Sequence, residues 1–314
     1  MKFKAFPKIP SIKNLARVLR DINPDKQEWQ FIGTVKLHGC NAAIGYSEGE
    51  VFYQSRNRII TPEDDNYGFA AWAEENLKPK LLDSIGRSTI TGTLIIYGEF
   101  IGQGIQKGVA VSELPKSFVA FAVSIDGEEV GSVEAMVMAQ HFGIDNVWEY
   151  PYHTIAVDPE NIKLITNEVL EKTLEVEEQC PYAFAHGVEG IGEGIVWSSY
   201  DANGIARFKS KGGKHKKGKK PNMQPVDMEM VKKLQDFIDE TVTHERLLQG
   251  LDYLREFNKP LDETSTGDFL RWIFNDIFEE EASVIEASGF DRKTLGKPIS
   301  SAARRWYFGS INEI

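Results

Sequence analysis

The sequence predicts an α+β fold, with antiparallel sheets in the first two thirds of the chain and a smaller all-helical domain at its end. Strand-like runs of apolar and β-branched residues, separated by short Gly-containing turns, recur up to residue 211. Beyond residue 226 the apolar residues repeat at helical spacing instead. Between these regions, Gly212 to Pro225 is rich in Gly, Lys and Pro, which is typical of an exposed linker. We therefore expect one domain over residues 1–222 and a helical C-terminal domain over 226–314.

The first half of the N-terminal domain combines one helix with several strands. Residues 11–22 have the pattern of an amphipathic helix, with Ser11 as its N-cap. β-Branched and aromatic runs predict strands over 29–37, 41–46, 50–55, 93–101 and 118–125.

The predicted helices of this domain lie between and after these strands. Thr61-Pro62-Glu63 suits a helix start, and an apolar stripe continues through Phe69, Trp72, Ala73 and Leu77. Further helices are expected over 133–142 and 167–178. A hairpin then pairs residues 193–200 with 204–211 across Asp201-Ala202-Asn203-Gly204.

The C-terminal domain shows two apolar stripes at helical spacing. The first consists of Met230, Val231, Leu234, Phe237, Ile238 and Val242, and the second of Phe269, Leu270, Trp272, Ile273, Phe274, Ile277 and Phe278.

Composition excludes several classes of protein. The chain has 314 residues, 41% of them apolar and 26% charged, and no apolar run reaches the length that crosses a membrane. Met1-Lys2-Phe3-Lys4 lacks the apolar segment of a signal peptide. Cys40 and Cys180 provide neither a disulfide framework nor metal-ligand spacing. We therefore expect a reducing, cytoplasmic setting.

The charge is unevenly distributed. A net charge of −11 argues against a protein that coats nucleic acid. Yet the stretch from Arg207 to Lys220 contains eight Lys or Arg and no acid. Because the local potential matters more than the sum, an enzyme that acts on nucleic acid is compatible with this composition.

Five short motifs follow one another, each near the end of a predicted strand. A lysine attacks only as the neutral amine, a form that nearby cations favour. An arginine can fork onto phosphate oxygens, and strand alternation places two lysines of a Lys-x-Lys pattern on one face. The motifs are Lys36-Leu37-His38-Gly39, Ser55-Arg56-Asn57-Arg58, Tyr97-Gly98-Glu99-Phe100, Glu193-Gly194-Ile195-Val196-Trp197 and Lys209-Ser210-Lys211.

In their order, these motifs resemble the covalent nucleotidyltransferase superfamily of polynucleotide ligases and mRNA capping enzymes. Within it, His38 in Lys-x-His-Gly, Asn41 two residues after Gly39, and the run from Gly98 to Lys107 are similar to the RNA ligase 2 family. The resemblance covers residues 29–217. One departure is Ala122, because family members often carry Asp after the aromatic residue that precedes it.

The resemblance implies an ATP-grasp-like nucleotidyltransferase domain and a three-step reaction. Lys36 attacks the α-phosphate of ATP, AMP passes to the 5′-phosphate of an RNA strand, and a 3′-hydroxyl then expels AMP. The implied catalytic residues are Lys36, His38, Arg56, Glu99, Glu193, Lys209 and Lys211. The implied nucleotide-binding residues are Val35, Lys36, Asn41, Arg56, Glu99, Phe121, Glu193, Lys209 and Lys211.

The resemblance also implies a division of roles. Glu99 would accept a hydrogen bond from the ribose, and Phe121 would stack on adenine. Arg56 and the lysine pair would hold the phosphates, with His38 near the departing pyrophosphate. Mg²⁺ or Mn²⁺ would be held by Glu193 and Glu99, since carboxylates suit hard cations.

The expected partners are ATP and RNA ends, most of all at nicks in duplex RNA. We expect a monomer and no membrane association. Duplex RNA is read by shape and by 2′-hydroxyl and phosphate contacts, which the helical tail could supply. Two alternatives stay open: a DNA ligase or mRNA capping-type nucleotidyltransferase, and a non-catalytic RNA-binding module with the same fold. Phe121 fits a core position about as well as a stacking one.

Overall fold

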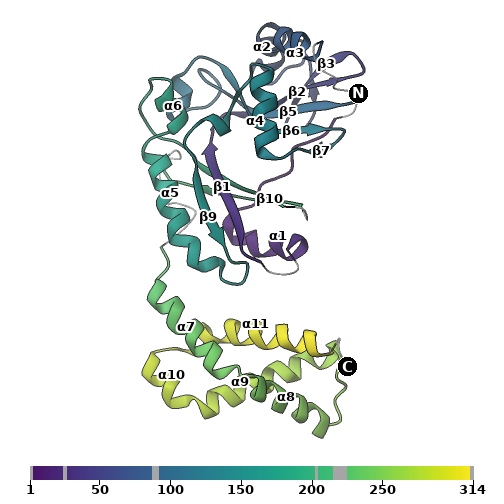
Figure 1. Ribbon diagram of the computed structural model, residues 1–314. Helices are drawn as coiled ribbons and strands as arrows, with labels where there is room; N and C mark the ends of the chain where they lie inside the picture. Colours follow the sequence, from purple (N-terminus) through teal and green to yellow (C-terminus); the bar gives the residue numbers. More distant parts are fainter. Residues whose placement is uncertain (1–2, 24–26, 87–91, 202–203, 215–224, 312–314) are drawn as a thin grey trace. The chain divides into compact units, whose positions relative to one another are not determined.

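The computed structural model describes residues 3–23, 27–86, 92–201, 204–214 and 225–311. The chain divides into two compact units, Met1–Pro225 and Val226–Ile314 (Figure 1). The first is a mixture of helices and largely antiparallel sheets, and the described part of the second is helical. The predicted α+β fold class is confirmed. No helix in the described ranges is long and apolar enough to cross a membrane.

One sheet of the first unit has the order β11–β10–β1–β9, with every neighbouring pair antiparallel. Helices α1 (Leu15–Ile22) and α5 (Thr166–Glu178) contribute to the core that covers one face. Along the central strand, Trp29, Phe31 and Val35 point into this core, so Lys36 lies on the opposite face. The strands are β1 (Trp29–Lys36), β9 (His153–Val157), β10 (Gly194–Asp201) and β11 (Gly204–Lys211).

The second sheet has the order β4–β3–β2–β5–β6–β7, and β8 joins β6 in parallel. Helices α2 (Phe69–Asn76), α3 (Lys78–Ile85) and α4 (Ser132–His141) pack in its core with Phe100 and Phe118. The strands are β2 (Cys40–Ser47), β3 (Glu50–Ser55), β4 (Ile59–Ile60), β5 (Leu94–Ile101), β6 (Ser117–Ile125), β7 (Glu128–Glu129) and β8 (Asp145–Asn146).

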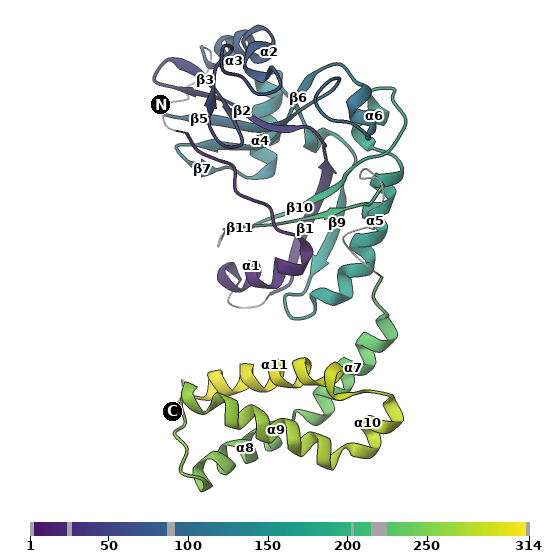
Figure 2. The ribbon, with the colours of Figure 1, turned by 180° about the vertical axis from the view of Figure 1, so that it is seen from behind.

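The N-terminal segment links the two sheets. Near its start, the main-chain N–H of Lys4 donates to the Gln54 side chain at 3.0 Å, in the second sheet. Near its end, the N–H of Lys209 donates to the carbonyl of Pro10 at 2.9 Å, in the first sheet. Figure 2 shows this purple segment running from the second sheet to α1. Phe6 is buried between these two anchors.

One local prediction is confirmed only in position, and another is wrong. Ser11 stands at the N-cap position of η1 with an extended backbone, but its side chain makes no cap hydrogen bond, and its backbone bridges to Lys209 of β11. Thr61 does not begin a helix: Ile59–Ile60 pairs with β3, a turn follows, and α2 starts at Phe69. The helix start is fixed by Asp65, whose carboxylate accepts from the N–H groups of residues 70 and 71 at 2.9 Å each.

The remaining sequence-based elements of this unit agree with the structure. The predicted strands and the helices near 133–142 and 167–178 are confirmed within a few residues. The predicted hairpin is confirmed as β10 and β11, paired as far as Asp201 and Gly204, while Ala202 and Asn203 lie outside the described residues. Most of the predicted linker, residues 215–224, also lies outside them. Short segments complete the unit: η1 (Ile12–Asn14), η2 (Ala110–Glu113), η3 (Val147–Glu149), η4 (Ile162–Ile165) and α6 (Pro181–Ala185).

The second unit packs its helices around Phe237, Leu251, Phe269, Ile273 and Tyr307. Both predicted apolar stripes are found, in α7 and α9. The side chains of Asp227 and Thr243 cap α7 and α8 by accepting from main-chain N–H groups. The elements are α7 (Met228–Thr241), α8 (His244–Glu256), η5 (Glu263–Ser265), α9 (Thr266–Glu280), α10 (Ala282–Ser288) and α11 (Arg292–Ile311).

Candidate active site

A cavity of about 500 Å³ is lined by residues of both sheets of the first unit. One wall is the face of the first sheet that carries Lys36, Val196 and Lys209. Every residue that the family resemblance implies to be catalytic or nucleotide-binding lines this cavity: Val35, Lys36, His38, Asn41, Arg56, Glu99, Phe121, Glu193, Lys209 and Lys211. Residues up to 176 positions apart in the chain, from Val35 to Lys211, therefore meet at one place, although their roles stay predictions.

Glu193 is the centre of the charged part of the cavity. Lys36 Nζ lies 2.5 Å from Glu193 Oε2, and the Lys211 ammonium group donates to Oε1. His38 Nδ1 lies 3.6 Å from Oε2. The strand register explains this meeting, because Lys36, Gly194 and Lys211 stand in one row across β1, β10 and β11.

The Glu193 carboxyl is ionised in these surroundings. Its side chain is only 1% exposed, and burial alone would raise its pKa. The adjacent His38 and the charges of Lys36 and Lys211 outweigh burial and hold the pKa of Glu193 well below its usual range. Glu193 thus offsets the repulsion between two ammonium groups that share the cavity.

Lys36, Arg56, Lys209 and Lys211 are four of the six Lys and Arg residues that line this cavity. Partial burial lowers the pKa of Lys209, and the charges of Lys211, Lys36 and Arg56 lower it further. The sequence led us to expect cations beside the Lys36 amine, and they are present. What the sequence did not indicate is that a carboxylate lies between Lys36 and Lys211. The cavity therefore combines several cations with the buried carboxylate of Glu193.

Ser210 fixes the direction of the two lysines on either side of it. Its buried hydroxyl accepts from the indole N–H of Trp197 at 2.9 Å and from the hydroxyl of Thr173 at 2.6 Å. Because side chains alternate along β11, anchoring Ser210 on the core face directs Lys209 and Lys211 into the cavity.

Gly39 allows a close approach between the lysine motif and β5. A Cβ at this position would lie 2.1 Å from the carbonyl oxygen of Phe100, which no side chain permits. The Gly39 N–H donates to Glu99 Oε1 at 2.9 Å. Burial raises the pKa of the Glu99 carboxyl, although the charge of Lys36 and this hydrogen bond oppose the effect. The two carboxylates of the cavity therefore have pKa values shifted in opposite directions.

Phe121 reaches the cavity from a β-bulge. The register between β5 and β6 shifts after Tyr97–Gly98, which leaves Phe121 as the extra residue of β6. Its partly buried ring packs against the edge of Phe6, with centroids 4.9 Å apart. The core and stacking interpretations are thus compatible, because Phe121 contacts the core and also lines the cavity.

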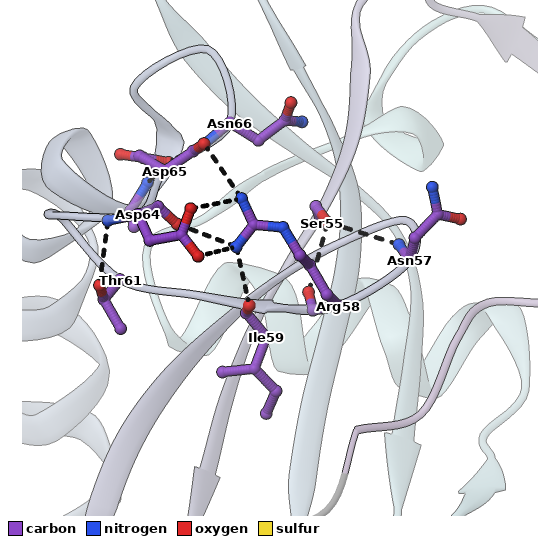
Figure 3. A network of polar contacts seen from close by, with 9 residues as sticks. Ser55, Asn57, Arg58, Ile59, Thr61, Asp64, Asp65 and Asn66 are labelled. Carbon is purple, nitrogen blue, oxygen red and sulfur yellow. Dashed lines mark hydrogen bonds and ion pairs between the residues drawn. The ribbon is translucent and has the colours of Figure 1, made fainter.

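A rigid turn presents Arg56. Figure 3 shows the Arg58 guanidinium held by Asp64, with Nη1–Oδ2 and Nη2–Oδ1 distances of 2.7 and 2.9 Å. Arg58 also donates to the carbonyl of Ile59 at 3.3 Å, and its own carbonyl accepts from the Ser55 N–H at 2.9 Å. Hydrogen bonds of Ser55, before Arg56, and of Arg58, after it, therefore hold the turn between β3 and β4. Arg56 itself is exposed and lines the cavity.

Several lining residues were not assigned a role from sequence. Arg207 forms a two-pronged ion pair with Glu129 of β7 and donates to the Tyr200 hydroxyl at 2.8 Å, so it joins the sheets beside the cavity. The alternation of residues 207, 209 and 211 along β11 was the signal that could have placed it. Phe6, Lys8 and Trp148 also line the cavity. No short sequence pattern predicted this, because their positions depend on how segments that are distant in sequence pack together.

The residues present suit a divalent metal that a bound nucleotide helps to hold. In the described ranges, no three His, Cys, Asp or Glu residues are arranged to hold a metal ion by themselves. Glu99 and Glu193 nevertheless line the same cavity, and Mg²⁺ is often bound by one or two carboxylates together with substrate phosphates and water. Cys40 is not a candidate nucleophile, because burial raises the pKa of its thiol to about 12.

Comparisons with known proteins point to one family. A family model described as RNA ligase matches residues 30–211. Similar solved structures include the Naegleria gruberi RNA ligase with PPi, at 18% identity, and a point mutant of that ligase with ATP and Mn, at 17% identity. Both have a TM-score of 0.47 and cover 67% of this chain and 56% of theirs, so the chain spans a little over half their length. A search of curated proteins found no match.

Proposed function

Because this chain belongs to the RNA ligase family, we propose that it is an ATP-dependent RNA ligase that forms a lysyl–AMP intermediate on Lys36. It would join a 3′-hydroxyl to a 5′-phosphate through an adenylylated RNA end. The observation that supports this best is the position of Lys36, at the end of β1 and inside a cavity with five further Lys or Arg residues and the buried carboxylate of Glu193.

The first step requires a neutral amine opposite an α-phosphate. Lys36, which is paired with Glu193 as an ammonium group, first loses a proton to water. The bond from Lys36 Nζ to the α-phosphorus then forms, the bond from that phosphorus to the pyrophosphate oxygen breaks, and the second proton that the nitrogen loses passes to the departing pyrophosphate or to water. Arg56, Lys209 and Lys211 would bind the phosphates and stabilise the charge that develops on them. His38, beside Lys36, would meet the departing pyrophosphate.

The rest of the cavity would bind the nucleoside. Phe121, supported from behind by Phe6, would stack on adenine, a contact that is worth about 1–3 kcal/mol for a base. Glu99 would accept from the ribose, and Asn41 and the main chain at Val35 would complete the nucleotide site.

Glu193 and Glu99 would hold Mg²⁺ or Mn²⁺ when nucleotide is bound. The metal would supply charge neutralisation at the phosphates. The donor chemistry is suitable, since both groups are carboxylates within one cavity.

We further propose that the protein is of the RNA ligase 2 kind and seals nicks in duplex RNA. In this assignment, residues 1–222 form the adenylyltransferase domain, and the helical residues 226–314 contribute to recognition of the duplex. His38, Asn41 and the run from Gly98 to Lys107 support the subfamily. We expect the protein to act as a monomer.

Incubation with α-labelled ATP and Mg²⁺ tests the proposed function. Wild-type protein should acquire a label that survives denaturation, and Lys36→Ala and Lys36→Arg should acquire none. The arginine variant is a useful control, because it keeps the positive charge and loses the nucleophile. A label that persists in both variants would refute the lysyl–AMP proposal. Labelling by GTP instead of ATP would indicate a capping-type enzyme. If ATP labels the protein, the labelled protein should seal nicked duplex RNA in preference to nicked DNA.

A further inference from the structure

The N-terminal segment carries positive charge that the proposed chemistry does not use. The first twenty residues contain six Lys or Arg and no Asp or Glu, in a chain with a net charge of −11. At the overall frequency of acids, 47 in 314 residues, about three would fall in a stretch of this length. The first acid is Asp21. The segment is therefore a basic region of an acidic protein.

Helix α1 and the turn before it separate this charge from the core. Leu15 and Leu19 are buried under the first sheet. Lys13, Arg17 and Arg20 are exposed and follow one another by four and three residues, so they lie on one side. We call these three residues the basic face. Among the described residues, no ion pair neutralises any of them.

The charges of the basic face repel one another, since like charges three and four residues apart are unfavourable on a helix. Of the three, Arg20 lies in the last turn of α1, where the helix dipole favours a cation.

The segment that precedes the basic face runs from the cavity past the edge strand β11, whereas α1 itself packs on the face of the first sheet opposite Lys36. The Pro10 carbonyl accepts from Lys209, and Ser11 bridges the same residue, so the chain enters the turn next to the strand that carries the lysine pair. Lys8 is exposed and lines the cavity itself. A rise of about 1.5 Å per residue places Arg20 about 10 Å beyond Lys13. Lys8 in the cavity and the basic face on α1 thus lie on the two sides of the edge strand β11, and the basic face is long enough to contact more than one backbone phosphate.

We propose that the basic face binds the sugar–phosphate backbone of the RNA whose end enters the cavity, an inference that rests on the proposed function. An RNA backbone fits because it is a regular polyanion that needs no apolar contact. A protein partner would also require an apolar centre. None of the large apolar side chains that are exposed in the described residues lies on α1.

The salt dependence of RNA binding tests this surface in the full-length protein. Binding of a fluorescent nicked RNA duplex is measured at several salt concentrations for wild type and for Arg17→Ala/Arg20→Ala. Two lost phosphate contacts should reduce the magnitude of the slope of log K against log salt by about 2, and weaken binding about tenfold at low salt. Arg17→Lys/Arg20→Lys should keep both values. Self-adenylylation with ATP should be unchanged, because neither residue lines the cavity.

A matched control removes two exposed cations elsewhere in the first unit, in Lys80→Ala/Lys163→Ala, and should keep the wild-type slope. An equal loss in this control would overturn the inference, because the effect would then come from net charge. RNA binding that is as strong and as salt-dependent in Arg17→Ala/Arg20→Ala as in wild type would also overturn it, and would leave the ligase function intact. If wild-type protein labels with ATP and binds no RNA, both the surface and the proposed RNA substrate are wrong.

Discussion

Two carboxylates of the first unit hold cations at similar distances in very different surroundings. Lys36 Nζ lies 2.5 Å from Glu193, whose side chain is 1% exposed. Arg58 Nη1 lies 2.7 Å from Asp64, whose side chain is 76% exposed. Water screens the second pair far more than the first. We therefore expect burial, more than distance, to determine how much each pair contributes to stability.

The buried Lys36–Glu193 pair also has the larger desolvation cost. Removing a carboxylate from water is unfavourable unless its partners compensate, and apolar residues would stabilise the fold as well or better. A buried charge in a cavity is therefore better explained by chemistry than by folding. The Arg207–Glu129 pair, with side chains 12% and 15% exposed, lies between the two extremes.

The largest expected effect follows Glu193→Gln, which keeps the shape and removes the charge. Self-adenylylation should slow by at least about 100-fold, because the cavity loses the negative charge of Glu193, which we propose as a metal ligand. The free energy of unfolding should fall by about 2 kcal/mol, less than for a fully buried pair, since Lys36 and Lys211 are each 20% exposed. Single-turnover labelling and guanidinium unfolding measure both. Asp64→Asn is the exposed control, and equal effects in the two variants would contradict the comparison.

The Arg207–Glu129 pair should give an intermediate effect. Arg207→Ala or Glu129→Ala should each destabilise the first unit by about 1–2 kcal/mol, because each leaves a mostly buried charge without its partner at a site where the carboxylate is more exposed than Glu193. In a double-mutant cycle, the two residues should couple by about 1–2 kcal/mol. Coupling near zero would mean that this pair behaves like an exposed one.

The pH dependence of stability should separate the two carboxylates of the cavity. The pKa of Glu193 is lowered, so its contribution is present above its ordinary value of 4.5 and decreases as the pH falls below it. The pKa of Glu99 is raised, so its contribution is present below 4.5 and is lost as the pH rises.

Unfolding at pH 3.5, 4.5 and 7 provides the measurement. The deficit of Glu193→Gln relative to wild type should shrink below pH 4.5, by up to about 1.4 kcal/mol per pH unit. Glu99→Gln should instead gain stability relative to wild type as the pH rises. If the stability of both variants relative to wild type changed in the same direction with pH, burial would not be the main influence on the pKa of Glu99.

The smallest effect is expected at the exposed pair. Arg58→Ala should lower stability by about 0.5–1 kcal/mol, and its coupling to Asp64 should stay below about 1 kcal/mol. The KM for ATP should rise about threefold, because the turn that presents Arg56 loosens. A tenfold or larger change in KM would mean that Arg58 itself contacts the nucleotide.

Local sequence patterns were sufficient to predict where many side chains of the cavity lie. Alternation along one strand put Lys209 and Lys211 on the same face, and the structure places both there. The apolar strands before Glu99 and at Lys36 were equally visible in sequence. In these cases the position of a side chain depends only on the period of its own strand.

Other features depend on partners that are remote in sequence. The meeting of Glu193 with Lys36 requires the register between β1 and β10, which no local pattern specifies. Phe6 reaches the cavity only because the N-terminal segment pairs near residues 54 and 209. The prediction that a helix begins at Thr61 was wrong, because the pairing of β4 with β3 and the side chain of Asp65 determine where α2 begins.

The most direct test of the central claim is to locate the nucleotide on the protein. After incubation with ATP and Mg²⁺, peptide mapping by mass spectrometry at neutral pH should find a single AMP on the peptide that contains Lys36, and on that lysine. AMP on Lys209, Lys211 or Lys8, with Lys36 unmodified, would contradict the account, because the nucleophile would then lie elsewhere in the same cavity.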